Sequence, residues 1–533
     1  MDEKLVDRSR LVQDAAHLLI DPPFPLERGH HDGDAHAGKA RLAAVKTRLG
    51  AALAVIVAFV ATYLLRLSSG IDNVDDYLYA RQTHAYLESL TSSDIGIVTA
   101  WKEFAQNSPL VPALATPLSA VDRAASTLVL VQLPLLLGLL AGAAVLLRHL
   151  GVSGRTRWVA AVAVTCLPPV LTYTAMLNFA LAATTCTVGA LAAYLSSDRL
   201  RRRRPTLVFG VLLGLLVLSR VVALVYLAAL AAGIVVDLLL DRTDVRSRLR
   251  NALLGALPAA LLAAPWWLTA GPSAWRYLRT AGYGQTVFTH QASLLDRETS
   301  RLRTITDETG LLLVGVVVLG VLVALLRPQR AVMLTSGIGL LTLVLLGTSS
   351  NAGTAFGLPA VALLSAVAAA GLVRLRPLSL AGAAIALALI VGVFVESTPP
   401  TLDRHPLWLS GTPGTAQADA ALGCRCIPSE LPALNRSVVD LAAGQAVLIL
   451  RADAVLNPES LRFAGNIDLR GPAGPLDATA VEGIPFVLAG STGASYLGTD
   501  LASAAATLVS LGFEPVLTRQ LSPTNSVVLY RRR

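Results

Sequence analysis

Apolar runs close to twenty residues long recur along most of this 533-residue chain, between residues 49 and 395. A run of that length forms an α-helix long enough to cross the hydrocarbon core of a bilayer. Hydrophobic residues make up 54% of the chain and charged residues 15%, whereas a soluble domain carries about 25% charged residues. These features predict a polytopic α-helical membrane protein.

Walking along the chain, we expect about eleven transmembrane helices. The expected spans are 49–67, 125–147, 158–172, 176–195, two within 206–240, 251–269, 311–326, 331–347, 355–373 and 378–395.

The placement of arginine predicts the orientation of these spans. The net charge of +9 comes from 44 Lys+Arg against 35 Asp+Glu, and much of the excess lies in short loops such as 199–204 and 242–250. Basic residues concentrate in cytoplasmic loops, so the pattern indicates membrane topology and not nucleic-acid binding. The N-terminus is then cytoplasmic, and three larger segments lie outside: 68–123, 271–310 and the chain from about 396.

The N-terminal residues 1–48 are polar and have no cleavable-signal pattern, so we expect a cytoplasmic, disordered tail. Its histidines could bind a metal, but a disordered segment offers no scaffold for one; they are His30, His31 and His36.

Residues 396–533 interleave short β-type runs with an apolar helix at about 500–511. This alternation predicts a small extracytoplasmic α/β domain. A glycine-containing turn at 490–493 is a weak signal for phosphate binding. Cys424 and Cys426 are separated by one residue, too close for an unstrained disulfide.

Three carboxylates follow the first span directly, at its outer end: Asp72, Asp75 and Asp76. Ionisable groups at the membrane edge are costly to place and usually serve a function. Tyr79 comes four residues after Asp75 and three after Asp76, so a helix would put it on their face. The alternative is a solvated loop with helix-capping aspartates.

Arg220 lies on the same outer face, in a short turn between the fifth and sixth spans. An arginine flanked there by Leu218 and Val221 predicts an anion-binding residue, although a side chain reaching lipid phosphates would give the same pattern. Asn178 begins the fourth span on this face.

A second outer segment contributes further cations and aromatic residues. Arg276 and Arg279 are three residues apart, so they could present one cationic face to a specific lipid phosphate or to anionic headgroups in general. Trp266 and Trp267 end a span and are expected to be interface anchors.

Together, these residues could serve two chemical needs on one membrane face. A carboxylate can take the proton of an acceptor hydroxyl, and arginines can stabilise a departing phosphate. Transfer of a sugar from a lipid-phosphate donor requires both.

The order and placement of these elements resemble those of the type C (GT-C) integral membrane glycosyltransferases, in particular the branch of protein O-mannosyltransferases and lipid A aminoarabinose transferases. The resemblance covers about residues 49–395. The similar elements are Asp75-Asp76, Tyr79-Ala80, Ser108-Pro109-Leu110, Gly214-Leu215 through Ser219-Arg220, Ala264-Pro265-Trp266, Tyr277-Leu278 with Gly282-Tyr283-Gly284, and Asn351 through Phe356-Gly357-Leu358-Pro359.

The resemblance implies a polyprenyl-phosphate-sugar donor, with Asp75 as general base and Asp76 supporting it. Asp76 stands where the family usually has Glu, and Asn178 stands near a second acidic position of several relatives, which leaves the base and any divalent metal open. The acceptor (protein, lipid or cell-envelope glycan) is not fixed. The residues expected to contact substrate are Asp72, Tyr79, Asn178, Arg220, Arg276, Arg279 and Tyr283.

Two other classes compete with this interpretation. A lipid or sugar transporter or flippase would place charged or broken helices near mid-membrane, often in related halves. Most spans here lack such charges, and no internal repeat is visible. A membrane anchor for the C-terminal part would need one span only.

Overall fold

A computed structural model of the chain describes most of the membrane part and parts of the C-terminal segment. The described residues are 33–69, 74–92, 96–105, 107–241, 243–279, six positions between 295 and 306, 311–349, 354–374, 431–450, 458–471, 476–490, 501–522 and 525–533.

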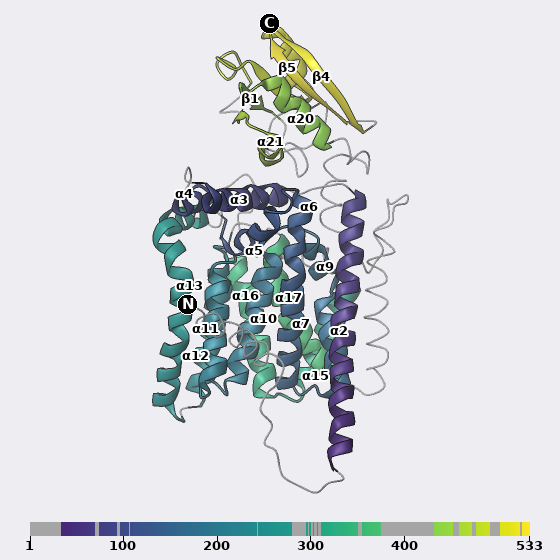
Figure 1. Cartoon of the computed structure of the whole chain (residues 1–533), viewed down its shortest axis with the longest axis vertical. Helices are drawn as coiled ribbons and strands as arrows, with labels where there is room; N and C mark the ends of the chain where they lie inside the picture. Colours follow the sequence, from purple (N-terminus) through teal and green to yellow (C-terminus); the bar gives the residue numbers. More distant parts are fainter. Residues whose placement is uncertain are drawn as a thin grey trace, which may run out of the picture. The chain divides into compact units, whose positions relative to one another are not determined.

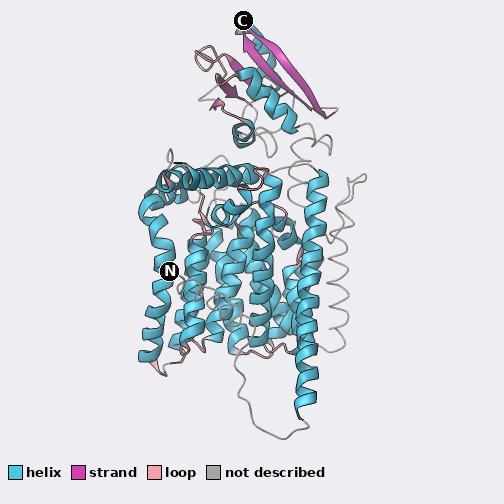
Figure 2. Cartoon of the chain, in the orientation of Figure 1, coloured by secondary structure: helices cyan, strands magenta, loops and turns pink. Residues whose placement is uncertain are grey.

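Helices make up the ordered elements as far as residue 374, and strands occur only in the C-terminal segment, within the described part (Figure 2). The long helices form a bundle (Figure 1). They are α2 (Gly33–Ser69), α7 (Gln132–His149), α10 (Ala180–Ser196), α11 (Arg203–Val217), α12 (Ala223–Leu239), α13 (Val245–Tyr277), α15 (Leu311–Leu325), α16 (Arg330–Gly347) and α17 (Leu358–Val373).

The helix α10 forms the centre of this bundle. Almost all of its side chains are buried, and it packs against α7, α11 and α17. A helix that is apolar around its whole circumference is stable only when other helices surround it.

Several described helices have the length and composition of membrane spans, which confirms a multi-pass membrane protein. Five are long and apolar enough, and four more are apolar but shorter. The expected number of eleven stays a prediction, since the span at 378–395 lies outside the described residues.

The prediction of one continuous helix for the third span, 158–172, is wrong. The chain forms α8 (Gly154–Thr165) and, after a break, α9 (Pro168–Thr174). Pro168 and Pro169 follow the break; they lack the N–H groups that would continue α8, while proline is well suited to a first helical turn.

Three shorter helices cover one end of the bundle, here called the α3 end. They are α3 (Val74–Thr91), α4 (Ile97–Glu103) and α5 (Leu110–Ser119). The helix α3 lies crosswise to the bundle helices and packs on α5 (Figure 1). Its buried face carries polar residues, among them Asp76, Gln82 and Thr83.

Glycines let two pairs of bundle helices approach closely. A Cβ atom on Gly210 of α11 would lie 1.8 Å from the carbonyl oxygen of Gly255 on α13. A Cβ atom on Gly371 of α17 would lie 2.0 Å from the carbonyl oxygen of Gly320 on α15. Small residues at such contacts are the usual means of packing helices in membranes.

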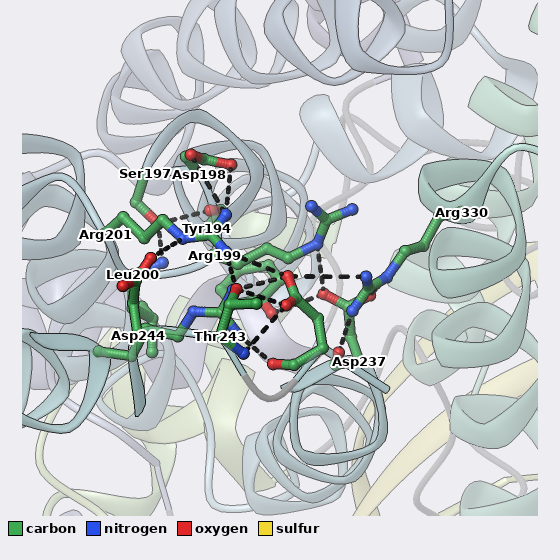
Figure 3. A network of polar contacts seen from close by, with 12 residues as sticks. Tyr194, Ser197, Asp198, Arg199, Leu200, Arg201, Asp237, Thr243, Asp244 and Arg330 are labelled. Atoms are coloured by element: carbon green, nitrogen blue, oxygen red, sulfur yellow. Dashed lines mark hydrogen bonds and ion pairs between the residues drawn. The ribbon is translucent and has the colours of Figure 1, made fainter. Parts of the chain in front are cut away.

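Ion pairs join the helices at the opposite end, here called the arginine end (Figure 3). Asp237 of α12 is 3% exposed and accepts hydrogen bonds from the Tyr194 hydroxyl at 2.7 Å, Arg199 Nε at 3.0 Å and Arg330 Nε at 2.5 Å. The network therefore ties α10, α12 and α16 together, and a buried carboxylate with several charged donors is the arrangement that burial demands.

The C-terminal segment contains a five-stranded sheet of order β2-β1-β3-β5-β4. Strands β1, β2 and β3 are parallel, and β5 is antiparallel to β3 and β4. The strands are β1 (Ala446–Ile449), β2 (Asp468–Arg470), β3 (Phe486–Gly490), β4 (Phe513–Ser522) and β5 (Asn525–Arg532).

Helices cover both faces of this sheet. Val447 and Ile449 of β1 pack with α20 (Leu431–Ala442) and α21 (Pro458–Ala464), whereas Leu448 packs with α22 (Leu501–Ser510) on the other face. The expected α/β arrangement is confirmed. Its boundary at 396, Cys424 and Cys426 lie outside the described residues.

Candidate functional site at the α3 end

Arg220 is the centre of a polar cluster at the α3 end. It lies in the turn between α11 and α12, and its Nη1 donates hydrogen bonds to the Tyr79 hydroxyl at 2.9 Å and to Asn107 Oδ1 at 3.0 Å. The ring of Phe179 lies beneath the guanidinium, 4.5 Å from ring centroid to Cζ. Three other chain segments thus fix this cation, and the structure brings together Tyr79 and Arg220, two of the residues expected to contact substrate.

The loop between α9 and α10 is held from two sides, which positions Phe179. Leu177 N donates to Asp76 Oδ1 at 2.5 Å, and this carboxylate is 1% exposed. Gln132 Nε2 of α7 donates to the carbonyl oxygens of Met176 at 2.7 Å and Asn178 at 3.0 Å. Asp76 therefore docks α3 onto this loop.

The side chain of Asn178 supports the same loop. Its Oδ1 accepts the N–H of Ala180, the first residue of α10, at 3.0 Å. This bond satisfies one of the donors that a helix leaves free at its start. Its role toward substrate stays a prediction.

A segment between α4 and α5 brings further polar groups to Arg220. Gln82 Nε2 donates to the carbonyl oxygen of Asn107 at 3.2 Å, and Leu110 N donates to the carbonyl oxygen of Leu218 at 3.0 Å. Asn107 Nδ2 and Ser108 Oγ are buried and have no hydrogen-bond partner in the described part of the chain. A buried donor left without a partner costs about 1–3 kcal/mol, so a polar ligand beside Arg220 would be favoured.

Burial favours the neutral form of two titratable side chains on α3, His84 and Tyr86. Burial lowers the pKa of His84 from its ordinary value of 6.5. Burial likewise raises the pKa of Tyr86, whose hydroxyl accepts a hydrogen bond from Gln82. Both side chains are therefore neutral near pH 7.

The remaining expected residues are not joined to this cluster by any described contact. Arg276, at the end of α13, and Arg279, in the π-helical residues that follow, are both exposed. Asp72 and Tyr283 lie outside the described residues, as does the side chain of Asp75, whose backbone belongs to α3.

Trp266 corrects one expectation. Its side chain is 1% exposed and packs with Ala105 and Val221, so it is not an anchor in the membrane interface. It instead fixes α13 against the turn that carries Arg220. Sequence reasoning also missed Phe179 and Gln132, because nothing in their local sequence separates them from ordinary span residues.

No group of three or more His, Cys, Asp or Glu side chains in the described residues could hold a metal ion. Asp72 and the Asp75 side chain lie outside the described residues, so the divalent metal stays a prediction.

Comparison with solved structures decides the fold. The structure of ArnT from Cupriavidus metallidurans bound to undecaprenyl phosphate aligns over 90% of this chain and 97% of its own, with a TM-score of 0.58 and 15% identity. The apo structure of the same enzyme aligns with a TM-score of 0.55 and 14% identity, over 89% of this chain and 97% of ArnT. The chain has a GT-C glycosyltransferase fold.

The chain also aligns with the solved structure of a second protein, the arabinofuranosyltransferase AftD from Mycobacteria. It aligns over 90% of this chain but 39% of AftD, with a TM-score of 0.52 and 17% identity. No protein-family model matches the sequence, and no curated protein matches it.

Proposed function

We propose that this protein transfers a sugar from a polyprenyl-phosphate donor to an acceptor at the outer face of the membrane. The observation that carries the proposal is the fixed Arg220, held by Tyr79 and Asn107 beside the acidic start of α3. The fold shared with ArnT, whose structure contains undecaprenyl phosphate, supports this class of donor.

Arg220 is proposed to bind the donor phosphate. Its hydrogen bonds to Tyr79 and Asn107 both use Nη1, and a guanidinium pre-oriented in this way suits the bidentate recognition of a phosphate. The buried donors Asn107 Nδ2 and Ser108 Oγ add hydrogen bonds beside it.

Asp75 is proposed as the general base. Asp76 accepts the Leu177 N–H inside the fold, and adjacent residues of a helix diverge by about 100°, so the two carboxylates have different tasks. The acceptor oxygen forms a bond to the anomeric carbon while the bond from that carbon to the phosphate oxygen breaks. Asp75 takes the acceptor proton, and the polyprenyl phosphate leaves with its negative charge facing Arg220.

The other predicted contacts belong to this proposal. Asp72 and Tyr283 are expected near the sugar, and Arg276 and Arg279 near the lipid phosphate or its neighbours. Asn178 is expected to act through the loop that it stabilises. The proposed orientation places the N-terminus in the cytoplasm and the C-terminal segment outside.

The test uses membranes that contain the protein and a radiolabelled, synthetic polyprenyl-phosphate sugar, and it measures transfer of label from the donor lipid to any other molecule, separated by chromatography. Asp75→Asn should bind donor yet transfer about 10²–10⁴-fold more slowly. Arg220→Ala should lose donor affinity, and Arg220→Lys should recover part of it. Arg155→Gln, an exposed change at the arginine end, is the control and should behave as wild type.

Two results would contradict the proposal. Wild-type transfer by both Asp75→Asn and Asp76→Asn would exclude the carboxylate mechanism. Movement of labelled donor between leaflets of a liposome, with no transfer in any membrane extract, would favour a transporter instead.

A further inference from the structure

The arginine end contains two groups of arginines that differ in how their charge is balanced. The first group belongs to the ion-pair network of Figure 3, where four arginines pair with four aspartates. These are Arg199, Arg201, Arg248 and Arg330 with Asp198, Asp237, Asp241 and Asp244. Their charges cancel within the protein.

The second group lies beside the first and has no such balance. Its five members are exposed, and their side chains make no ion pair or hydrogen bond within the described residues. They are Arg202, Arg203, Arg204, Arg246 and Arg250, here called the free arginines.

Helix packing places the starts of α11 and α13, which carry the free arginines, next to each other at one end of the bundle, here called the edge. The helices α11 and α13 run side by side in the same direction, since Gly210 meets Gly255 and Gly214 meets Ala259. At their starts, Asn251 Nδ2 donates to the carbonyl oxygens of Leu200 at 2.7 Å and Arg201 at 2.9 Å. Both helices therefore begin at the same level.

The electrostatics of this edge favour an anion. Arg246 and Arg250 are four residues apart and share a helix face, and Arg203 and Arg204 open α11. The start of a helix is itself the positive end of its dipole. Like charges at two such starts repel one another until a counter-charge is bound.

The same two helices present an apolar surface directly deeper in the membrane. Leu207 and Val208 of α11 are 42% and 53% exposed, and Leu253 and Leu257 of α13 are 66% and 58% exposed. Along these two helices, positively charged side chains therefore lie at the start, and exposed aliphatic side chains follow one to two helical turns further into the membrane. A lipid with an anionic headgroup has the same order of groups along its length.

We propose that the free arginines, with the apolar faces of α11 and α13 below them, bind anionic phospholipids of the surrounding bilayer. The headgroup phosphates lie against the arginines, and the acyl chains lie along the leucines and valines. A soluble polyanion would use the cations and leave the apolar surface without a role. The surface is at the opposite end from Arg220 and does not depend on the function proposed for that residue.

The experiment is native mass spectrometry of the delipidated protein in detergent, titrated with phosphatidylglycerol or with phosphatidylcholine. The triple change Arg204→Gln, Arg246→Gln and Arg250→Gln removes charge from the edge and leaves the ion-pair network intact. A basic residue near an anionic surface contributes about 1 kcal/mol, or about fivefold in affinity, so the triple change should weaken phosphatidylglycerol binding roughly a hundredfold.

The control carries the same loss of charge at scattered exposed arginines of the same end, Arg148→Gln, Arg155→Gln and Arg327→Gln. It should bind phosphatidylglycerol within about threefold of wild type, and phosphatidylcholine should bind weakly to all three proteins. Equal loss in both triple variants would overturn the proposal, because only net charge would then matter. Displacement of phosphatidylglycerol by an equal concentration of glycerol phosphate would overturn it as well, since the apolar surface would have no part.

Discussion

The placement of Arg220 depends on two neutral acceptors, the Tyr79 hydroxyl and the Asn107 amide oxygen. Neutral acceptors orient the guanidinium without cancelling its charge, whereas a carboxylate at either position would form an ion pair and compete with a phosphate. The two hydrogen bonds thus remove rotational freedom from a long side chain and bring no carboxylate of their own to it.

Substitution of Asn107 tests this point. Asn107→Asp should form an ion pair with Arg220 and raise the KM for the lipid donor. Asn107→Leu should remove one hydrogen bond to Arg220, leave the guanidinium less well oriented and raise the same KM. Hydrogen bonds to charged groups are worth about 1.5–3 kcal/mol, so a rise of about 10- to 100-fold is expected. The measurement is the rate of sugar transfer as a function of the concentration of lipid donor. Asn251→Leu, which removes a buried amide at the arginine end, is the control and should lower stability with little change in KM.

Asp76 has a structural role that differs from the one expected for Asp75. Asp76→Asn keeps an oxygen that can accept the Leu177 N–H, whereas Asp76→Leu leaves this buried donor unpaired. We expect Asp76→Leu to reduce the free energy of unfolding by about 1–3 kcal/mol and Asp76→Asn to reduce it less. Thermal unfolding in detergent measures both, and equal stability of the two variants would show that the contact is unimportant.

Helix packing at the element scale relies on glycine at particular positions. On α15, a Cβ atom at Gly320 would lie 2.7 Å from the Ala368 carbonyl oxygen, whereas a Cβ atom at Gly315 would meet nothing within 4 Å. The two glycines share a helix and a membrane environment, so they form a matched pair.

Gly320→Ala should separate α15 from α17 and reduce the free energy of unfolding by about 1–3 kcal/mol. Gly315→Ala should leave stability unchanged or raise it by up to about 1 kcal/mol, because alanine is the better helix former. Tryptophan fluorescence during thermal unfolding distinguishes the two. Equal losses for both variants would mean that glycine matters for helix flexibility and not for contact.

Sequence reasoning reached the elements that carry a strong local signal. Apolar runs predict most bundle helices, and the alternation of spans predicts one membrane face for the turn at Arg220 and the segment at Tyr79. It missed the break at Pro168, since the surrounding residues are apolar enough to continue a span. It also missed the use of Asp76 and Gln132, because a hydrogen bond to a backbone group more than forty residues away leaves no trace in local sequence.

At the scale of the whole molecule, the orientation in the membrane remains a prediction from the arginine pattern. A reporter that is active only in the cytoplasm should stay silent when fused after Arg533 and be active when fused before residue 33. The opposite pair of results would invert the orientation and place Arg220 on the cytoplasmic face.

The helix α3 is synthesised well before the residues that it contacts, which matters for how the protein folds during its synthesis. Asp76 meets its partner 101 residues later, and Tyr79 meets Arg220 141 residues later. A ribosome synthesises and inserts the chain from its N-terminus, so α3 must remain at the membrane surface, its carboxylate in water, until the loops before α10 and α12 have emerged. The hydrogen bonds that position Arg220 can therefore form only after the turn between α11 and α12 has been synthesised.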